Sequence, residues 1–311
     1  MSKDTRIVYV GKQNYQIEEL TKTIIQMAEI WGGFSKMFPY GSTVLLKPNL
    51  VLRASRERNA LTDPVLIDAV LSILKNCGVK ASLGDSPAFE SAETVANSIG
   101  IKAVCDHYQV PIINFKKNAF SDNDDIKKWK IFHQINDFDA VLNLPKLKGH
   151  AQLYYTGGVK NLFGCVAGKT KFMHHMAIGD KNFNFGRMLL EVADLVNPTL
   201  TIMDGIGAQA GNGPLHGEPV HLGLLAMSKS PIALDFSVCK LLEGELEKMD
   251  IYRASKQDGK WAYSREFEEI WLSDKEIGKG FYFPTNRQPI RFSVSHAVKS
   301  VFKTLKRRVF S

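Results

Sequence analysis

Lys160 follows a glycine pair in a stretch that holds many of the chemically suggestive side chains of this sequence. Burial beside Leu162 and Phe163 would lower the proton affinity of its amine and make the amine a nucleophile or Schiff-base former. Gly157 and Gly158 allow close backbone approach and could hold a phosphate or carboxylate through their N–H groups. We predict Lys160 as catalytic and both glycines as cofactor-binding; a solvated surface lysine is the alternative.

Three histidines flank Lys160: His150 precedes it by ten residues, and His174 and His175 follow by fourteen and fifteen. Neutral imidazole nitrogens are good ligands for divalent metals. Adjacent histidines point in different directions, so only one of His174 and His175 should face the site. We predict metal ligation by His150 with one of that pair, and a catalytic role for His150. A structural role is the alternative for each.

Lys146 and Lys148 alternate across Leu147. In an extended backbone both side chains point to the same face, which would give a paired positive site for a phosphate or carboxylate. Lys47 is a third candidate for the same site. A solvated strand end is the alternative.

Asp85 and Asp204 each follow a hydrophobic run that is typical of a buried strand. Either could act as a general base or metal ligand, and Asp85 is our catalytic candidate. Capping of the following turn is the alternative for Asp85. Asn49 follows another such run and is predicted to bind the cofactor. Asn212, between two glycines, is first a turn residue and second a ligand contact.

The elements that position these residues alternate between short β-branched runs and longer amphipathic segments. Asp63 is a plausible N-cap of one helix, and Pro64 suits its first turn. Strands separated by helices predict an α/β fold with mostly parallel sheet and flanking helices, as one body or as two lobes around a cleft. Ligands bind at the carboxyl ends of such strands, where the candidate residues cluster. We expect strands at 6–10, 43–47, 80–87, 111–115, 139–145 and 200–206, and helices at about 16–30 and after Pro64.

Residues 145–183 show no clean helical or strand period, and such long loops are usually functional. They contain no Walker A motif after a strand and no G-x-G-x-x-G, so dinucleotide binding is unsupported. We expect residues 1–250 to form the α/β domain around this cleft loop. Residues 251–311 would be a C-terminal extension.

The charge of the chain is concentrated near its C-terminus. The net charge is +8, but residues 292–311 carry five basic residues and no acid, which leaves 35 basic against 32 acidic residues elsewhere. Nucleic acid is therefore not an expected partner. Apolar residues in 292–311 recur at helical spacing, which predicts a basic amphipathic helix that lies on an anionic membrane or packs on the protein body.

The four cysteines lie far apart, without a C-x-x-C pair. This spacing excludes the standard iron–sulfur motifs and a disulfide framework, so we expect no iron–sulfur cluster in this chain and a cytoplasmic location, with or without membrane association. The first ten residues lack the apolar stretch of a signal peptide.

Six motifs in order resemble the domain of unknown function 362 family. They are LLKPNL (45–50), TDPVLIDAVLSILKNCGVK (62–80), GDSP (84–87), NLPKLKGH (143–150), GGVKNLFG (157–164) and DGIGAQAGNGPLHGEP (204–219). Members are often joined to a module with two iron–sulfur clusters, so the resemblance implies that this role is absent here or is supplied by a redox partner.

The block from GHAQLYYTGGVKNLFG to KFMHH is similar in layout to the core of the lactate racemase family. That resemblance implies a nickel-pincer nucleotide bound through a thioamide to Lys160, with a histidine ligand at His174 or His175. Asp85 stands where that family has its catalytic histidine, so the resemblance does not extend to racemisation by two histidine bases.

Our leading hypothesis is an enzyme that acts on an anionic small molecule or a nucleotide-like cofactor at this Lys/His/Gly-rich loop. The chemistry would be metal-assisted redox, isomerase or lyase chemistry, with a divalent metal or a nickel-pincer-like nucleotide. The alternative is a non-catalytic metal or cofactor carrier that docks to an iron–sulfur redox partner.

Overall fold

The computed structural model describes residues 4–87, 90–115, 131–166, 174, 178, 183–213 and 216–290. In these ranges ten strands form one sheet in the order β10-β1-β9-β8-β5-β2-β3-β4, with β6 beside β8 and β7 beside β6. Most neighbouring strands are parallel; the pairs β1–β9, β8–β9 and β6–β7 are antiparallel. The α/β fold with a mostly parallel sheet is thereby confirmed.

The strands are β1 (Arg6–Val10), β2 (Thr43–Pro48), β3 (Lys80–Asp85), β4 (Ile112–Asn114), β5 (Ala140–Leu144), β6 (Lys146–His150), β7 (Tyr154–Thr156), β8 (Leu200–Asn212), β9 (His216–Ser228) and β10 (Glu268–Trp271). The α-helices are α1 (Ile17–Ala28), α2 (Phe34–Met37), α3 (Pro64–Asn76), α4 (Ala92–Ser98), α5 (Ile101–His107), α7 (Gly158–Leu162), α9 (Asn184–Val196), α10 (Pro231–Leu241) and α11 (Asp250–Gln257). Short 3-10 turns lie at Glu29–Trp31, Arg56–Arg58, His133–Asp137, Phe163–Cys165, Leu246–Lys248 and Gly259–Arg265.

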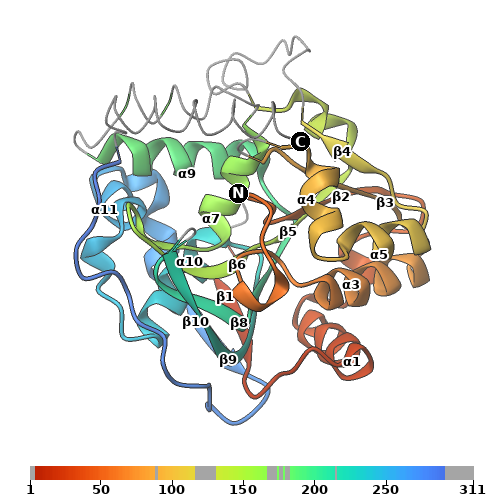
Figure 1. Ribbon diagram of the computed structural model, residues 1–311, viewed down its shortest axis with the longest axis horizontal. Helices are drawn as coiled ribbons and strands as arrows, with labels where there is room; N and C mark the ends of the chain where they lie inside the picture. Colours follow the sequence, from red (N-terminus) through yellow and green to blue (C-terminus); the bar gives the residue numbers. More distant parts are fainter. Residues whose placement is uncertain are drawn as a thin grey trace, which may run out of the picture.

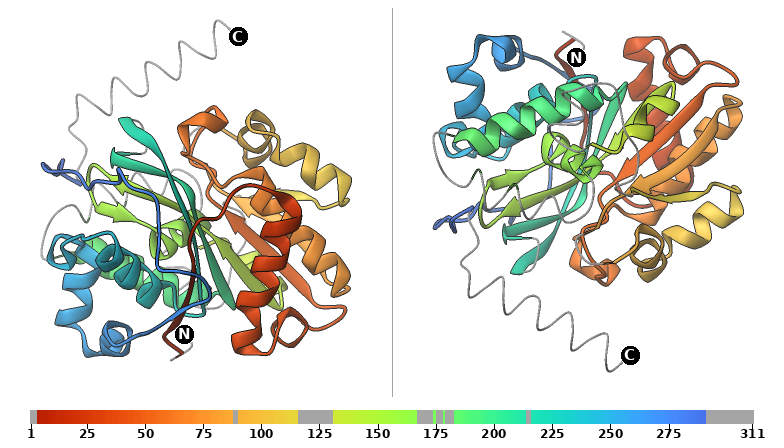
Figure 2. Two further views of the ribbon diagram at one scale, coloured as in Figure 1. Left: turned by 90° about the horizontal axis from the view of Figure 1, so that it is seen from below. Right: turned by 90° about the horizontal axis from the view of Figure 1, so that it is seen from above.

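The sheet lies between two groups of helices, which Figures 1 and 2 show on its opposite faces. Successive strand residues point to opposite faces, so the strands feed two separate cores. In β2, Leu45 packs in the core that contains α7, α9, α10 and α11, whereas Val44 and Leu46 pack in the core that contains α1, α3, α4 and α5. This period-two burial explains why the strands read as continuous hydrophobic runs.

Most predicted elements lie where the sequence placed them. The Asp63 carboxylate accepts the N–H of Val65 at 2.9 Å, as an N-cap does, and α3 ends at Asn76 with Cys77 as its C-cap. Gly78 then takes a φ of +69°, which favours glycine. The prediction was wrong at β8, which does not end near Gly205 but continues to Asn212. Gly211 and Asn212 therefore lie at the end of the first strand of a long β8–β9 hairpin, not in a turn at a parallel strand end.

The segment 145–183 is not an irregular loop over its described part. Residues 146–165 form β6, β7, α7 and a 3-10 turn, each of three to five residues. Elements this short complete too few periods to leave a hydrophobic pattern, which is why the sequence looked aperiodic. Residues 167–173, 175–177 and 179–182 lie outside the described ranges.

Residues 251–290, which we expected in a C-terminal extension, contribute to the same sheet. β10 pairs in parallel with β1, and Trp271 stacks on Tyr9 with ring centroids 4.9 Å apart. The predicted helix in 292–311 lies outside the described residues. Across the ranges that are described, none of the helices combines the length and apolar character needed to cross a bilayer.

Candidate active site

Four lysines gather at the carboxyl ends of the central parallel strands. Lys47 ends β2, Lys146 and Lys148 lie on β6 just after β5, and Lys160 lies in α7. The first three are at most 2% exposed, and Lys160 is half-buried. We refer to these residues as the four-lysine cluster. Buried ammonium groups are costly unless they are paired, so their partners decide what the cluster can do.

Lys47 is neutralised by Asp85. Its Nζ lies 2.9 Å from Asp85 Oδ1 and donates to the carbonyl of Pro48 at 2.6 Å. The other carboxylate oxygen, Oδ2, accepts the backbone N–H of Leu50 at 2.8 Å. Gly164 packs directly on this pair, and a side chain there would collide with both partners. Asp85 therefore serves as the counter-ion of Lys47, and it ties the ends of β2 and β3 together.

Lys146 is neutralised by Asp204. Its Nζ lies 2.9 Å from Asp204 Oδ2 and donates to the Tyr15 hydroxyl at 2.8 Å. Tyr15 in turn donates to Asp204 Oδ1 at 2.6 Å. Burial, followed by the negative charges of Asp204 and Asp63, raises the pKa of Tyr15 far above its usual range, so the hydroxyl stays protonated. This closed triad leaves Lys146 no free charge for a ligand.

Among the described residues, the acceptors of Lys148 are all neutral. Its Nζ donates to Asn49 Oδ1 at 2.8 Å and to the carbonyl of Ala60 at 2.9 Å. Desolvation, followed by the positive charges of Lys160 and Lys146, lowers its pKa to about 7. The protonated and neutral forms of this buried amine therefore coexist near physiological pH.

Lys160 lies in α7 with its Nζ 5.2 Å from the centre of the Phe163 ring. Within the described ranges no carboxylate lies within ion-pair distance of it. Desolvation lowers its pKa to about 8, while the charge of Asp85 acts in the opposite direction. Its helix begins at Gly158, whose N–H donates to Asp235 at 2.6 Å, as that of Val159 does at 2.9 Å.

Lys146 and Lys148 lie in an extended backbone, because β6 spans Lys146–His150, and their role in anion binding stays a prediction. Gly157 and Gly158 were predicted to bind an anion through their backbone N–H groups. The N–H of Gly158, however, already donates to the Asp235 carboxylate. A side chain at Gly157 would also collide with Asp235. Asn212 lies exposed at the end of β8, opposite His216, and no described contact joins it to the four-lysine cluster.

The predicted histidine ligands do not gather in the described part of the chain. Nδ1 of His150 accepts the backbone N–H groups of Gln152 and Leu153, each at 3.2 Å, and so holds the turn between β6 and β7. His175 lies outside the described residues, and His174 is described without its neighbours. No group of three His, Cys, Asp or Glu residues that could hold a metal occurs in the described ranges. Metal ligation stays a prediction, and no step below uses it.

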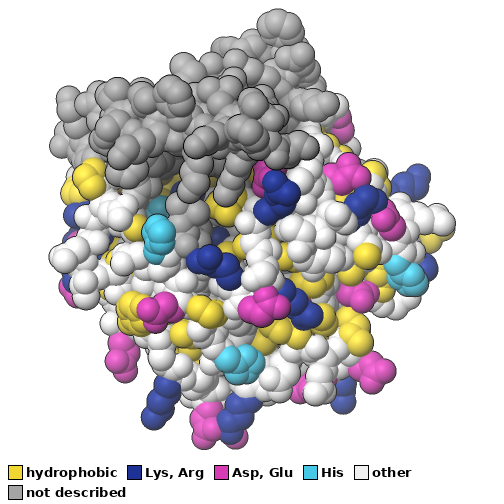
Figure 3. Space-filling model, in the orientation of Figure 1, with side chains coloured by type: hydrophobic (Ala, Val, Ile, Leu, Met, Phe, Trp, Pro, Cys, Tyr) yellow, Lys and Arg dark blue, Asp and Glu magenta, His cyan; other side chains and the backbone are white. Residues whose placement is uncertain are grey.

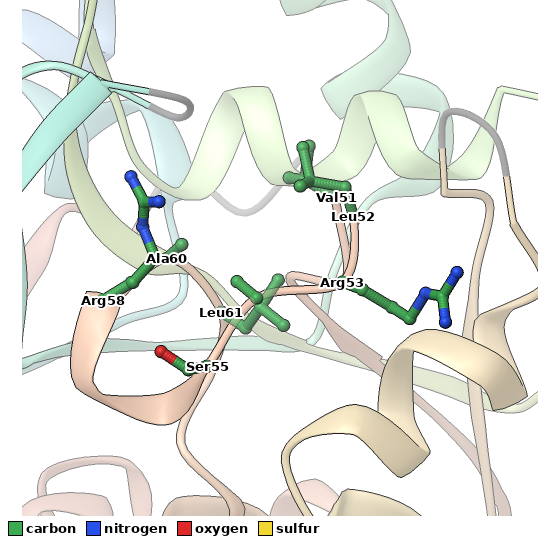
Figure 4. Close-up of a pocket in the computed structure, with 8 residues that line it drawn as sticks. Val51, Leu52, Arg53, Ser55, Arg58, Ala60 and Leu61 are labelled. Carbon is green, nitrogen blue, oxygen red and sulfur yellow. The ribbon is translucent and has the colours of Figure 1, made fainter. Parts of the chain in front are cut away.

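A pocket of about 230 Å³ is lined by residues between Val51 and Leu61, and none of the four lysines is among its lining residues. Figure 4 shows Arg53 and Arg58 at opposite sides of it, with apolar side chains between them. Arg53 pairs with Glu90 at 2.5 Å. Ala60, whose carbonyl accepts from Lys148, lines the pocket, so the amine lies directly behind the pocket wall. The lining residues are Val51, Leu52, Arg53, Ala54, Ser55, Arg58, Ala60 and Leu61.

The outer surface carries a different charge pattern. On the face in Figure 3, basic, acidic and apolar side chains are interspersed, as the nearly balanced charge of residues 1–291 predicts. The concentration of lysines at the strand ends is thus a feature of the interior of the protein. Two of the four lysines, Lys148 and Lys160, have no carboxylate partner among the described residues, so the unbalanced positive charge lies inside the protein and not on its surface.

Sequence reasoning missed four polar residues of this site: Tyr15, Asn143, Asn161 and Asp235. Asn143 is fully buried in β5, and a lone polar residue in a hydrophobic strand was a usable signal. Asn161 directly follows Lys160 in the GGVKNLFG motif. Nothing in the sequence pointed to Tyr15 or Asp235, because only the fold brings them to the cluster.

The fold and the strand-end residues together define an α/β protein with a buried cluster of polar and charged side chains. Residues 44–240 match the family model described as "Domain of unknown function (DUF362)". The chain belongs to that family, as its motifs predicted. The likeness to the lactate racemase core stays a prediction.

Two further proteins are similar to this chain. A thylakoid-associated protein of Synechocystis sp. is 36% identical over 293 residues, which cover 94% of this chain and 91% of that protein. A crystal structure of a protein from Thermotoga maritima matches with a TM-score of 0.43 and 12% identity, over 73% of this chain and 58% of that one. The chain thus spans less than two-thirds of the Thermotoga protein, and neither fold nor function is transferred from it.

Proposed function

We propose that this chain is an enzyme that binds an anionic small molecule at the four-lysine cluster. The observation that supports this proposal most is the imbalance of buried charge. Lys47 and Lys146 each have a carboxylate partner, whereas Lys148 and Lys160 have none among the described residues. A carboxylate or phosphate group would supply the missing negative charge.

An enzyme is favoured over a simple carrier because the two lysines have pKa values near neutrality. A carrier of an anion needs ammonium groups that keep their charge. An amine with a pKa of about 7 exchanges a proton readily at physiological pH, as acid–base and nucleophilic catalysis require.

The test is calorimetric titration of the full chain with oxalate and with inorganic phosphate. The Lys160→Met variant should bind the preferred anion about tenfold more weakly, the loss expected for one charge-assisted contact of about 1.4 kcal/mol. Lys22→Met, at an exposed lysine of α1, is the matched control and should bind as the wild type does. Equal affinity of all three proteins, or no binding by the wild type, would contradict the proposal.

A second proposal concerns the membrane surface. The relative from Synechocystis is named as thylakoid-associated, and the basic segment 292–311 has the composition of a helix that lies on anionic lipid. Co-sedimentation with phosphatidylglycerol vesicles should fall when the chain ends at residue 291. Unchanged binding would favour the alternative, in which the segment packs on the protein body. The iron–sulfur redox partner stays a prediction.

A further inference from the structure

Lys148 is held differently from the other lysines of the cluster. Its Nζ donates to Asn49 Oδ1 and to the Ala60 carbonyl. The carbonyl oxygen of Ala60 can only accept a hydrogen bond, so one N–H of Lys148 is fixed in direction. The direction of the second N–H depends on whether Asn49 turns its Oδ1 or its Nδ2 toward Lys148.

A chain of amide side chains decides the orientation of Asn49. Asn161 Nδ2 donates to the Lys47 carbonyl at 2.9 Å and to Asn143 Oδ1 at 2.8 Å. Because a carbonyl accepts only, Asn161 must direct its Nδ2 there and its Oδ1 towards Asn49. Asn49 then donates from Nδ2 to that Oδ1 at 3.1 Å and presents its own Oδ1 to Lys148.

Asn143 anchors the far end of this chain. Its Nδ2 donates to the carbonyl of Gly158 at 3.1 Å and to Thr201 Oγ1 at 3.3 Å. Every amide in the series Asn143, Asn161 and Asn49 is therefore oriented by an acceptor-only carbonyl or by its neighbour. Both acceptors of Lys148 are preorganised, and a neutral Lys148 amine would use its two N–H bonds on them. Its lone pair must then point in the one remaining direction.

Lys160 is suited to the opposite role. Its ammonium faces the ring of Phe163, a contact that favours the charged form. The negative charge of Asp85 also favours the ammonium of Lys160, whereas the largest charge effect on Lys148 is repulsion by Lys160. Lys160 is half-buried, so it is the most exposed lysine of the cluster. One lysine can hold an anion while the other stays neutral.

We propose that Lys148 is a nucleophilic amine that forms an imine with an anionic aldehyde or 2-oxo acid, whose anionic group is held by Lys160. This inference rests on the proposed function and names its substrate class. The lone pair of Nζ attacks the carbonyl carbon, and the C=O π electrons move to oxygen. Loss of that oxygen as water, with the two hydrogens of the amine, leaves a C=N bond. No oxidant or reductant is consumed.

The experiment traps this imine in the full chain. The protein is incubated with glyoxylate, reduced with sodium borohydride and mapped by peptide mass spectrometry. We expect the adduct on Lys148 in the wild type and in Lys22→Met, and its loss in Lys148→Met. Adducts spread over exposed lysines, or an adduct on Lys160 with Lys148 unmodified, would overturn the proposal.

Asn49→Asp tests the positioning of the amine without removing it. A carboxylate beside Nζ should raise the pKa of Lys148, so adduct formation should move to higher pH by at least one unit. An unchanged pH profile in a variant with a wild-type circular dichroism spectrum would contradict the role of Asn49. A failure of either variant to fold leaves the adduct site in the wild type as the deciding measurement.

Oxalate binding separates the failure of this inference from failure of the proposed function. If oxalate binds in a Lys160-dependent way and no adduct forms on Lys148, the imine is wrong and the anion site stands. If oxalate does not bind and the adduct is absent, both proposals fall. An adduct on Lys148 without oxalate binding would support the nucleophile and contradict the anion-holding role of Lys160.

Discussion

Lys148 is a buried amine whose protonation couples to the stability of the fold. Its pKa is about 7 in the folded chain and about 10.5 when unfolded. Below pH 7 both states are protonated, and stability does not change with pH through this group. Between pH 7 and 10.5 only the unfolded state holds the proton, so the free energy of unfolding rises with pH.

Lys148→Met should remove this dependence. From pH 7 to 9 the wild type should gain about 2 kcal/mol of unfolding free energy relative to the variant. Urea denaturation at both pH values measures the gain, and Lys22→Met serves as the control that keeps it. Parallel changes of the wild type and Lys148→Met would mean that Lys148 titrates at an ordinary pKa.

Gly164 is the residue that lets α7 and its following turn pack on the Lys47–Asp85 pair. A methyl group at this position would overlap Asp85 Oδ1 and both the Cε and Nζ of Lys47. Gly164→Ala should therefore destabilise the protein by about 1–3 kcal/mol, the usual cost of overpacking. Gly259→Ala, where a Cβ meets nothing within 4 Å, should change stability by less than about 0.5 kcal/mol. Equal thermal stability of the two variants would contradict this packing.

At the scale of elements, α7 is a five-residue helix that depends on Asp235 of α10. An asparagine at position 235 has only one side-chain oxygen, so it could accept from only one of the N–H groups of Gly158 and Val159. Its NH2 group would face the other N–H, and two donors cannot form a hydrogen bond. Asp235→Asn should cost about 1–3 kcal/mol of stability and speed hydrogen exchange at those two amides. It should also weaken oxalate binding, because α7 carries Lys160.

Asp194→Asn is the matched control for this prediction. The Asp194 carboxylate accepts the indole N–H of Trp261 at 2.9 Å, away from α7. The Asp194→Asn substitution should reduce stability. It should leave hydrogen exchange at Gly158 and Val159, and the affinity for oxalate, unchanged. Slow exchange at those amides in Asp235→Asn would show that α7 does not need its acidic partner.

The strands and the long helices were predictable because each carries a full period of burial. β2 and β5 fill both cores with alternate residues, and α3 adds a cap and a glycine stop. The elements from β6 to α7 were not predictable, since each is too short to show a period. For the same reason the partners of the lysines were not predictable: Tyr15 and Asp235 reach the cluster from sequence positions about 130 and 75 residues away.

At the scale of the whole molecule, residues 250–290 complete the fold. β10 pairs with β1, and Phe283 stacks on Tyr154 with ring centroids 4.6 Å apart. A chain that ends at residue 266 should lose most of its cooperative unfolding, whereas a chain that ends at residue 290 should keep it. Calorimetric scans of both proteins measure this. A cooperative transition in the shorter chain would instead support a domain boundary near residue 250.

NMR titration of lysines labelled at Cε tests the charge imbalance at the four-lysine cluster most directly. Two lysines should titrate at pH values near 7 and 8, and the substitutions Lys148→Met and Lys160→Met should each remove one of these signals. Oxalate should raise the pKa of the signal assigned to Lys160, because a bound anion favours the ammonium. Titration of every lysine above pH 10, with no response to oxalate, would contradict the account.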